Sequence, residues 1–202
     1  ANGLVEIAGG NLLFTLFFTM ITSLILGMGA PTTANYIITS TIAAPALILL
    51  KVAPLAAHMF VFYFGIIADL TPPVALAAYA GAGIAKADPM KTGFIATKLA
   101  IGAFIVPYIF VYNPAMLLIG TTLATLTQNL ITALSGMFGV GVAMIGYCLA
   151  PMRWWERVWF IIGGLLLIDP GTVTDLIGIA MLAMGVVYQW RKSQLRKIQG
   201  VS

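Results

Sequence analysis

Long apolar segments separated by short polar breaks form the pattern of the chain. Six of them follow one another, covering residues 11–50, 55–85, 93–112, 121–149, 159–168 and 172–190. About 20 apolar residues in a helix cross the hydrocarbon core of a bilayer. The pattern therefore predicts transmembrane helices, except that 159–168 is too short to span on its own. The Trp-rich "PMRWWERV" (151–158) is predicted to be an interfacial turn, "DPG" (169–171) a turn and the basic "RKSQLRK" (191–197) a tail.

Two of the segments are interrupted by residues that break helices. The segment 11–50 contains "GMGAPTT" at 27–33, and the segment 55–85 contains "ADLTPP" at 68–73. Because proline has no N–H, Pro31 is expected to free the Gly27 carbonyl, and the two prolines of the second break those of Ala68 and Asp69. Broken backbone at membrane depth persists only inside protein, against water or around an ion, so both breaks are candidate sites.

The first break allows two models, because the segment 11–50 can turn back as a re-entrant hairpin or span straight through, and in both a helix begins again near Thr32. Gly27 and Gly29 allow the chain to turn back, or the backbone to come close to a ligand. The new helix would point its N–H groups at an anion, and nearby hydroxyls would cap it. We therefore predict a substrate site for an anion, formed by Pro31, Thr32, Thr33 and Asn35.

The second break predicts a cation site, because it collects hard oxygen ligands. Asp69 offers a carboxylate, Thr71 a hydroxyl and Ala68 a carbonyl, which suit a desolvated Na⁺. The candidate residues are Gly27, Gly29, Ala68, Asp69, Thr71 and Pro72, with Ala68 and Thr71 as the Na⁺ ligands. Two alternatives are structural: a break can be a kink or a packing contact, and Asp69 can pair with His58 or Lys98.

Composition supports an integral membrane protein. Of the 202 residues, 61% are hydrophobic and 8% are charged, far from the balance of soluble domains. The net charge of +4 comes from Lys and Arg that are scattered or lie beside apolar segments, a pattern that records topology and lipid contact and not nucleic-acid binding. If 11–50 and 159–190 are both hairpins, nearly all of these residues share one side, which the positive-inside rule makes cytoplasmic. No metal cluster, nucleophile motif or phosphate loop indicates an enzyme.

The motifs closely resemble the large membrane subunit of TRAP transporters, the tripartite ATP-independent periplasmic carriers. The resemblance lies in "GMGAPTTANYIITSTIAAPALILL", "PLAAHMFVFYFGIIADLTPPVALAAYAGAGIAKADPMKTG" and "FIVPYIFVYNPAMLL", which follow in that order within residues 1–120. The version most alike is the fused permease that works with TAXI-type binding proteins. Related subunits carry G-x-x-T-P-P-V-G at the second break; Thr71 to Val74 match it, whereas Ala68 and Ala75 replace both glycines.

The resemblance implies an elevator-type secondary transporter built from two inverted repeats, each with a helical hairpin and a discontinuous helix. Residues 1–120 would be the second repeat, with hairpin 11–50, discontinuous helix 55–85 and helix 93–112. Residues 121–202 would add transmembrane helices and a basic cytoplasmic tail. The sequence is then expected to be a fragment or to pair with a separate N-terminal half.

The function expected from this is import of a small carboxylate across a bacterial or archaeal inner membrane. A periplasmic binding protein would deliver the substrate, a small membrane subunit would assist, and Na⁺ or H⁺ would be the coupling ion, with no other cofactor. Two alternatives are a channel component and a membrane assembly subunit that does not transport. All depend on whether 27–33 and 68–73 meet.

Overall fold

The computed structural model describes residues 2–168 and 171–198, and this part of the chain contains helices and no strand. Its contacts divide the chain into two compact units, Ala1–Ile119 and Gly120–Ser202. The all-helical prediction is therefore confirmed. Each unit is described by itself.

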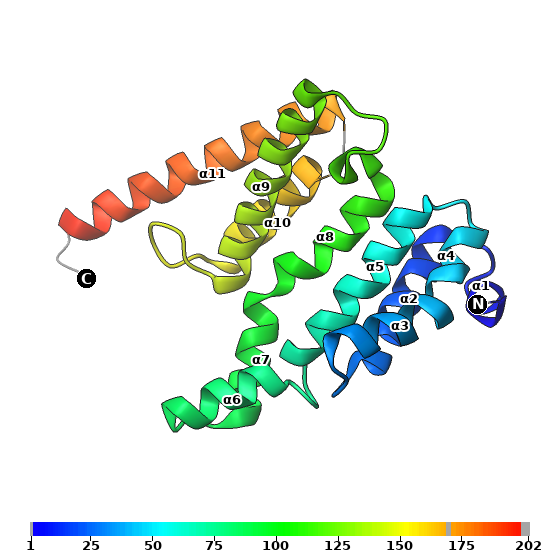
Figure 1. Ribbon diagram of the computed structural model, residues 1–202. Coiled ribbons are helices and arrows are strands. Elements are labelled where there is room, and N and C mark those ends of the chain that lie inside the picture. Colours follow the sequence, from blue (N-terminus) through cyan, green and yellow to red (C-terminus); the bar gives the residue numbers. More distant parts are fainter. Residues whose placement is uncertain (1, 169–170, 199–202) are drawn as a thin grey trace. The chain divides into compact units, whose positions relative to one another are not determined.

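The described residues of unit 1 form eight helices and two short 3₁₀ turns, whose course can be followed in Figure 1. In chain order they are α1 Asn2–Ile7, α2 Leu12–Gly27, α3 Thr32–Ile42, α4 Ala44–Leu49, α5 Pro54–Ile67, the 3₁₀ turn η1 Ala68–Leu70, α6 Leu76–Ala85, α7 Pro89–Leu99, α8 Ile101–Tyr112 and the 3₁₀ turn η2 Pro114–Leu117.

The segment 11–50 forms a helical hairpin. Asn11 caps α2, accepting from the N–H groups of Leu13 at 2.9 Å and Phe14 at 3.3 Å. The chain turns at Gly29, whose φ is +74°, and α3 and α4 return along α2. A second interruption, at Ala43, separates α3 from α4; Pro45 follows it and has no N–H for the Thr41 carbonyl.

Helix α5 is the centre of unit 1, where it packs against α2, α3, α4 and α8. Its Phe60 and Phe64 are fully buried, and their ring centroids lie 4.9 Å apart. Tyr108 of α8 meets the Phe60 ring edge-on at 5.3 Å. Such edge-to-face aromatic pairs add directional packing to the dispersion contacts of the core. This rigid core positions the end of α5 and the break that follows it.

The single helix predicted at 93–112 is wrong, because the structure has two helices bent by 42° at Ala100. No breaker stands at position 100. The bend follows from tertiary contacts, since α7 packs against α6 whereas α8 packs against α5. Pro107 lies inside α8 and does not end it.

Unit 2 consists of α9 Leu123–Ile145, α10 Trp154–Ile168 and α11 Thr172–Ile198, with α10 packed against both others. Glycines let these helices approach closely: a Cβ added to Gly136 of α9 would lie 2.6 Å from the Gly164 carbonyl oxygen of α10. Gly163 of α10 faces Met181 and Leu182, and Gly185 of α11 faces Phe160. Residue numbers in α11 rise as those of their partners in α10 fall, so α10 and α11 form an antiparallel hairpin.

Two predictions for unit 2 are wrong. The segment 151–158 is not a turn, because α10 begins at Trp154; and 191–197 is not a separate tail, because α11 continues to Ile198. Asp169 and Pro170 of the predicted turn lie outside the described residues.

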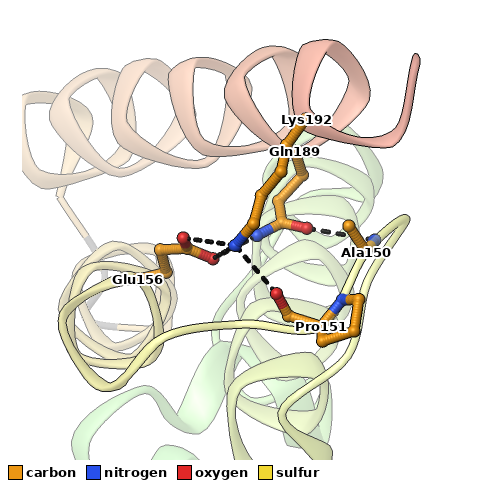
Figure 2. A network of polar contacts seen from close by, with 5 residues as sticks. All are labelled: Ala150, Pro151, Glu156, Gln189 and Lys192. Carbon is orange, nitrogen blue, oxygen red and sulfur yellow. Dashed lines mark hydrogen bonds and ion pairs between the residues drawn. The ribbon is translucent and has the colours of Figure 1, made fainter. Parts of the chain in front are cut away.

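A polar network explains why the basic end of α11 remains helical (Figure 2). Glu156 of α10 is 2% exposed and accepts from Lys192 Nζ at 2.6 and 3.0 Å and from Gln189 Nε2 at 2.5 Å. Gln189 accepts in turn from the Ala150 N–H at 3.1 Å, and Lys192 donates to the Pro151 carbonyl at 2.8 Å. Side chains from α11 therefore hold both α10 and the loop before it.

Within the described residues, three stretches have the length and apolar composition to cross a membrane: Thr32–Leu49, Leu123–Ile145 and Val173–Arg196. The bent pair α7 and α8 would be a fourth if it counts as one span. Three shorter apolar helical stretches, Leu12–Gly27, Pro54–Leu70 and Leu76–Ala85, belong to the hairpin and to the interrupted segment 55–85.

Candidate functional site

Asn35 connects the hairpin tip to α5, close to the second break. It stands in the first turns of α3, is 3% exposed, and donates from Nδ2 to the Gly65 carbonyl at 2.8 Å. The same nitrogen lies 3.4 Å from the Gly27 carbonyl. One amide group therefore joins both arms of the hairpin to α5, three residues before η1 begins.

Two glycines make this junction possible. A Cβ added to Gly27 would lie 2.5 Å from the Gly65 carbonyl oxygen and 2.8 Å from its Cα, so no other residue fits at position 27 without moving α2 or α5. Helix α2 also contacts η1, the first residues of the second break. Gly27 of the first break therefore lies against Gly65, three residues before the second break, while the contact predicted between 27–33 and 68–73 themselves stays a prediction.

The second break lies where it was predicted, but its carbonyls are not all free. The Ala68 carbonyl accepts from the Thr71 N–H at 3.1 Å, and the Leu70 carbonyl accepts from Thr97 Oγ1 of α7 at 3.1 Å. The prediction that Ala68 loses its hydrogen bond is therefore wrong, because the chain tightens to a 3₁₀ turn before Pro72. The Ala68 carbonyl oxygen has a second lone pair, which can still bind a cation.

The Gly27 carbonyl is bonded only weakly. It accepts from the Ala30 N–H at 3.5 Å and from Asn35 Nδ2 at 3.4 Å, both at the long limit for a hydrogen bond. The effect predicted for Pro31 is therefore a loosened carbonyl instead of a free one. Gly27 itself is helical, and only Gly29 adopts the positive φ expected of the turn.

Several buried oxygens in unit 1 have no hydrogen-bond partner within the described residues. They are Thr19 Oγ1, Ser23 Oγ, Asn35 Oδ1 and Asp69 Oδ1. Thr71 Oγ1 donates to the Ile67 carbonyl at 2.9 Å, which leaves its lone pairs available as well. Buried acceptors without a donor are costly, and a cation is one ligand that would satisfy them.

Sequence reasoning missed Thr19 and Ser23. With Gly27 they repeat every four residues, so they lie on one face of α2, and all three are buried. That spacing is visible in the sequence and was the available signal. Gly27 of this stripe lets α2 pack closely on α5, so part of its role is structural.

The structural alternative for Asp69 is contradicted. His58 Nδ1 lies 3.1 Å from the Tyr36 hydroxyl, and the Asp69 carboxylate has no ion pair among the described residues. Asp69 therefore pairs with neither His58 nor Lys98.

The predicted anion end of the hairpin is open. Thr32 and Thr33 are exposed at the start of α3, preceded by Pro31 as the N-cap residue. The expected capping by hydroxyls is wrong, because no side chain caps this helix. Its first N–H groups consequently keep their capacity to bind an anion.

Two interrupted helical elements packed against each other, buried oxygens without partners among the described residues, and helices long and apolar enough to cross a membrane are together typical of membrane carriers. The sequence pattern of one family, described as tripartite ATP-independent periplasmic transporter, DctM component, matches residues 1–125. The chain belongs to this family, whose members are components of a transporter and not enzymes. Neither a search of curated proteins nor one of solved structures returned a match.

Proposed function

We propose that this chain supplies half of the transport site of a cation-coupled importer for small carboxylates. The observation that carries the proposal is the junction of Asn35, Gly27 and Gly65, which holds the hairpin tip beside the second break. The remaining half would come from the N-terminal repeat of the permease. A periplasmic binding protein, of the TAXI type by resemblance, would deliver the substrate, and a small membrane subunit would complete the carrier in the inner membrane.

The two ends of the site would take different ligands. The open start of α3, with Thr32 and Thr33, would receive the substrate carboxylate, because helix N-termini favour anions. The cation would be held by oxygens around η1, which are the Asp69 carboxylate, the Thr71 hydroxyl and the Ala68 carbonyl. Asn35 Oδ1 belongs to the amide that is bonded to Gly65, just before η1. Asn35 then serves mainly to position the tip, since its amide nitrogen is already engaged.

The coupling ion is proposed to be Na⁺. Neutral oxygens together with one carboxylate suit a monovalent hard cation, whereas proton coupling would need only the carboxylate. The two cases differ at Thr71, which matters for Na⁺ and not for H⁺. In this scheme the hairpin and the discontinuous helix would move together as one elevator unit.

Uptake by proteoliposomes containing the complete permease and its binding protein tests the proposal. Thr71→Val and Asp69→Asn should each lower the uptake of radiolabelled substrate at least tenfold and raise the Na⁺ concentration for half-maximal uptake. Thr92→Val and Asp88→Asn are the matched controls. Both residues lie at the start of α7, where the exposed Asp88 accepts from the Lys91 N–H and Thr92 donates to the Asp88 carbonyl. Unchanged uptake in both site variants would reject the site and favour a subunit that only assembles the membrane complex.

A further inference from the structure

A cavity lies in unit 2, between α9 and α11. Its volume is about 650 Å³, and its polar lining consists of Thr127, Gln128 and Thr132 from α9 and Asp175 from α11. The cavity lies outside the part of the chain that matches the family, residues 1–125, except for the start of α9. Nothing in the transport site of unit 1 accounts for it.

Asp175 is the unusual member of this lining. It is 8% exposed, its Oδ1 is wholly buried without a hydrogen-bond partner, and no described residue forms an ion pair with it. It stands in the first turn of α11, where the helix dipole favours a negative charge. A buried carboxylate of this kind is costly at the end of a membrane-crossing helix unless a ligand satisfies it.

The residues facing Asp175 across the cavity offer acceptors. Thr127 Oγ1 donates to the carbonyls of Leu123 at 3.0 Å and Ala124 at 2.8 Å. Thr132 Oγ1 lies 3.2 Å from two carbonyls of its own helix, so its hydrogen is engaged too. Both hydroxyl oxygens therefore keep lone pairs that can accept, and the Gln128 amide adds a further oxygen to the lining.

We propose that this cavity binds a cation of single positive charge, with the Asp175 carboxylate as its counter-ion and the oxygens of Thr127, Gln128 and Thr132 around it. One carboxylate balances one charge, and the described residues contain no group of three His, Cys, Asp or Glu side chains of the kind that holds a divalent ion. An alkali-metal ion and a primary ammonium share this chemistry. The cation stabilises the pairing of α9 with α11, which make few direct contacts.

Thermal unfolding of the complete transporter in nanodiscs tests this site. NaCl replaces choline chloride at constant ionic strength, and the unfolding midpoint is followed against Na⁺ concentration. The measurement is made in the Thr71→Val background, which removes the proposed coupling site. In this background, adding Asp175→Asn should raise at least tenfold the Na⁺ concentration that gives half of the increase in the unfolding midpoint. Adding Thr132→Val should raise it about threefold. Asp88→Asn, the same change at an exposed carboxylate, should leave it unchanged.

The outcomes separate the two proposals. If Asp175→Asn and Thr132→Val both leave the titration of the Thr71→Val protein unchanged, the cavity binds no cation and the inference is wrong. If Thr71→Val itself leaves the wild-type titration unchanged, the coupling site in unit 1 fails while the result for Asp175 stands. Methylammonium chloride in the same titration distinguishes an ammonium from an alkali ion: a shift that depends on Asp175 with either salt supports the site.

Discussion

At the scale of single residues, Asn35 is the side chain on which the candidate site depends most. Its amide nitrogen donates to the carbonyls of Gly65 and Gly27, and its Oδ1 is buried without a partner. The two functions of the group are separable: the nitrogen holds the tip in place, and the oxygen remains available to a cation. Substitutions that keep the shape but change the donor can distinguish them.

Asn35→Asp should destabilise the protein by about 2–4 kcal/mol, because it removes the donor and sets carboxylate oxygens against two carbonyl oxygens. Uptake should fall with it, even at saturating Na⁺. Asn113→Asp is the control, since the Asn113 side chain makes no hydrogen bond in the described part of the chain. Thermal unfolding in nanodiscs measures the difference, and equal midpoints for the two variants would contradict the role given to Asn35.

The single cysteine, Cys148, provides a second test at this scale. It lies in the loop between α9 and α10, and burial raises the pKa of its thiol. A raised pKa means less thiolate at pH 7, so maleimide labelling should be slow there and should keep increasing to a higher pH than for an ordinary thiol. Gln194→Cys in a Cys148→Ser background is the exposed reference. Identical pH profiles at the two positions would refute the partial burial of Cys148.

At the scale of helices, the sequence predicts the breaks at 27–33 and 68–73, but it misses the interruption at Ala43 and the bend at Ala100. Pro31 and the Pro72–Pro73 pair marked the hairpin tip and the discontinuous helix. The bend at Ala100 has no local signal in the sequence. It arises because α7 packs against α6 whereas α8 packs against α5. Likewise, the sequence alone predicts a tail at the charged end of α11, because it does not show that Lys192 forms an ion pair with the buried Glu156.

The candidate site shows the same division. The residue types at both breaks were predictable from proline and glycine chemistry. The packing of the first break on the end of α5 was not predictable, because it requires Gly65, a glycine inside an apolar helix, to face Gly27 and Asn35. Thr19 and Ser23 were detectable by their four-residue spacing, but only the packed structure identifies their face as the buried one.

Gly65→Ala should separate α3 from α5. The added Cβ would press on Asn35 Oδ1 and lie 3.0 Å from its Cγ, a buried group that cannot move without releasing Gly27. Overpacking of this kind costs about 1–3 kcal/mol. Gly81→Ala in α6 is the matched control, because no atom lies within 4 Å of its added Cβ and alanine favours the helix by roughly 1 kcal/mol.

Thermal unfolding and uptake should both distinguish the two glycine variants. The midpoint should fall for Gly65→Ala and stay or rise for Gly81→Ala, with uptake reduced only in the first. A Gly65→Ala protein that transports like the wild type would mean that the tip tolerates a looser junction than the structure indicates.

At the scale of the whole molecule, the division into two compact units predicts that damage in one is confined to it. The network around Glu156 lies entirely in unit 2, where it joins α10, α11 and the loop at 150–151. Removing one partner leaves a buried charge unpaired, which costs roughly 3–5 kcal/mol when the pair is fully buried and less here, because Lys192 is 21% exposed.

Lys192→Met should therefore raise hydrogen exchange in α10 and α11 while leaving α2, α3 and α5 as protected as in the wild type. Lys91→Met, at an exposed lysine whose side chain has no hydrogen bond or ion pair in the described residues, is the control and should change neither unit. The double variant Glu156→Leu with Lys192→Met should recover part of the lost protection, because neither charge is then buried alone. Exchange measured by mass spectrometry on the complete transporter resolves these segments. Loss of protection spreading through α2 and α5 in Lys192→Met would show that the two units fold as one.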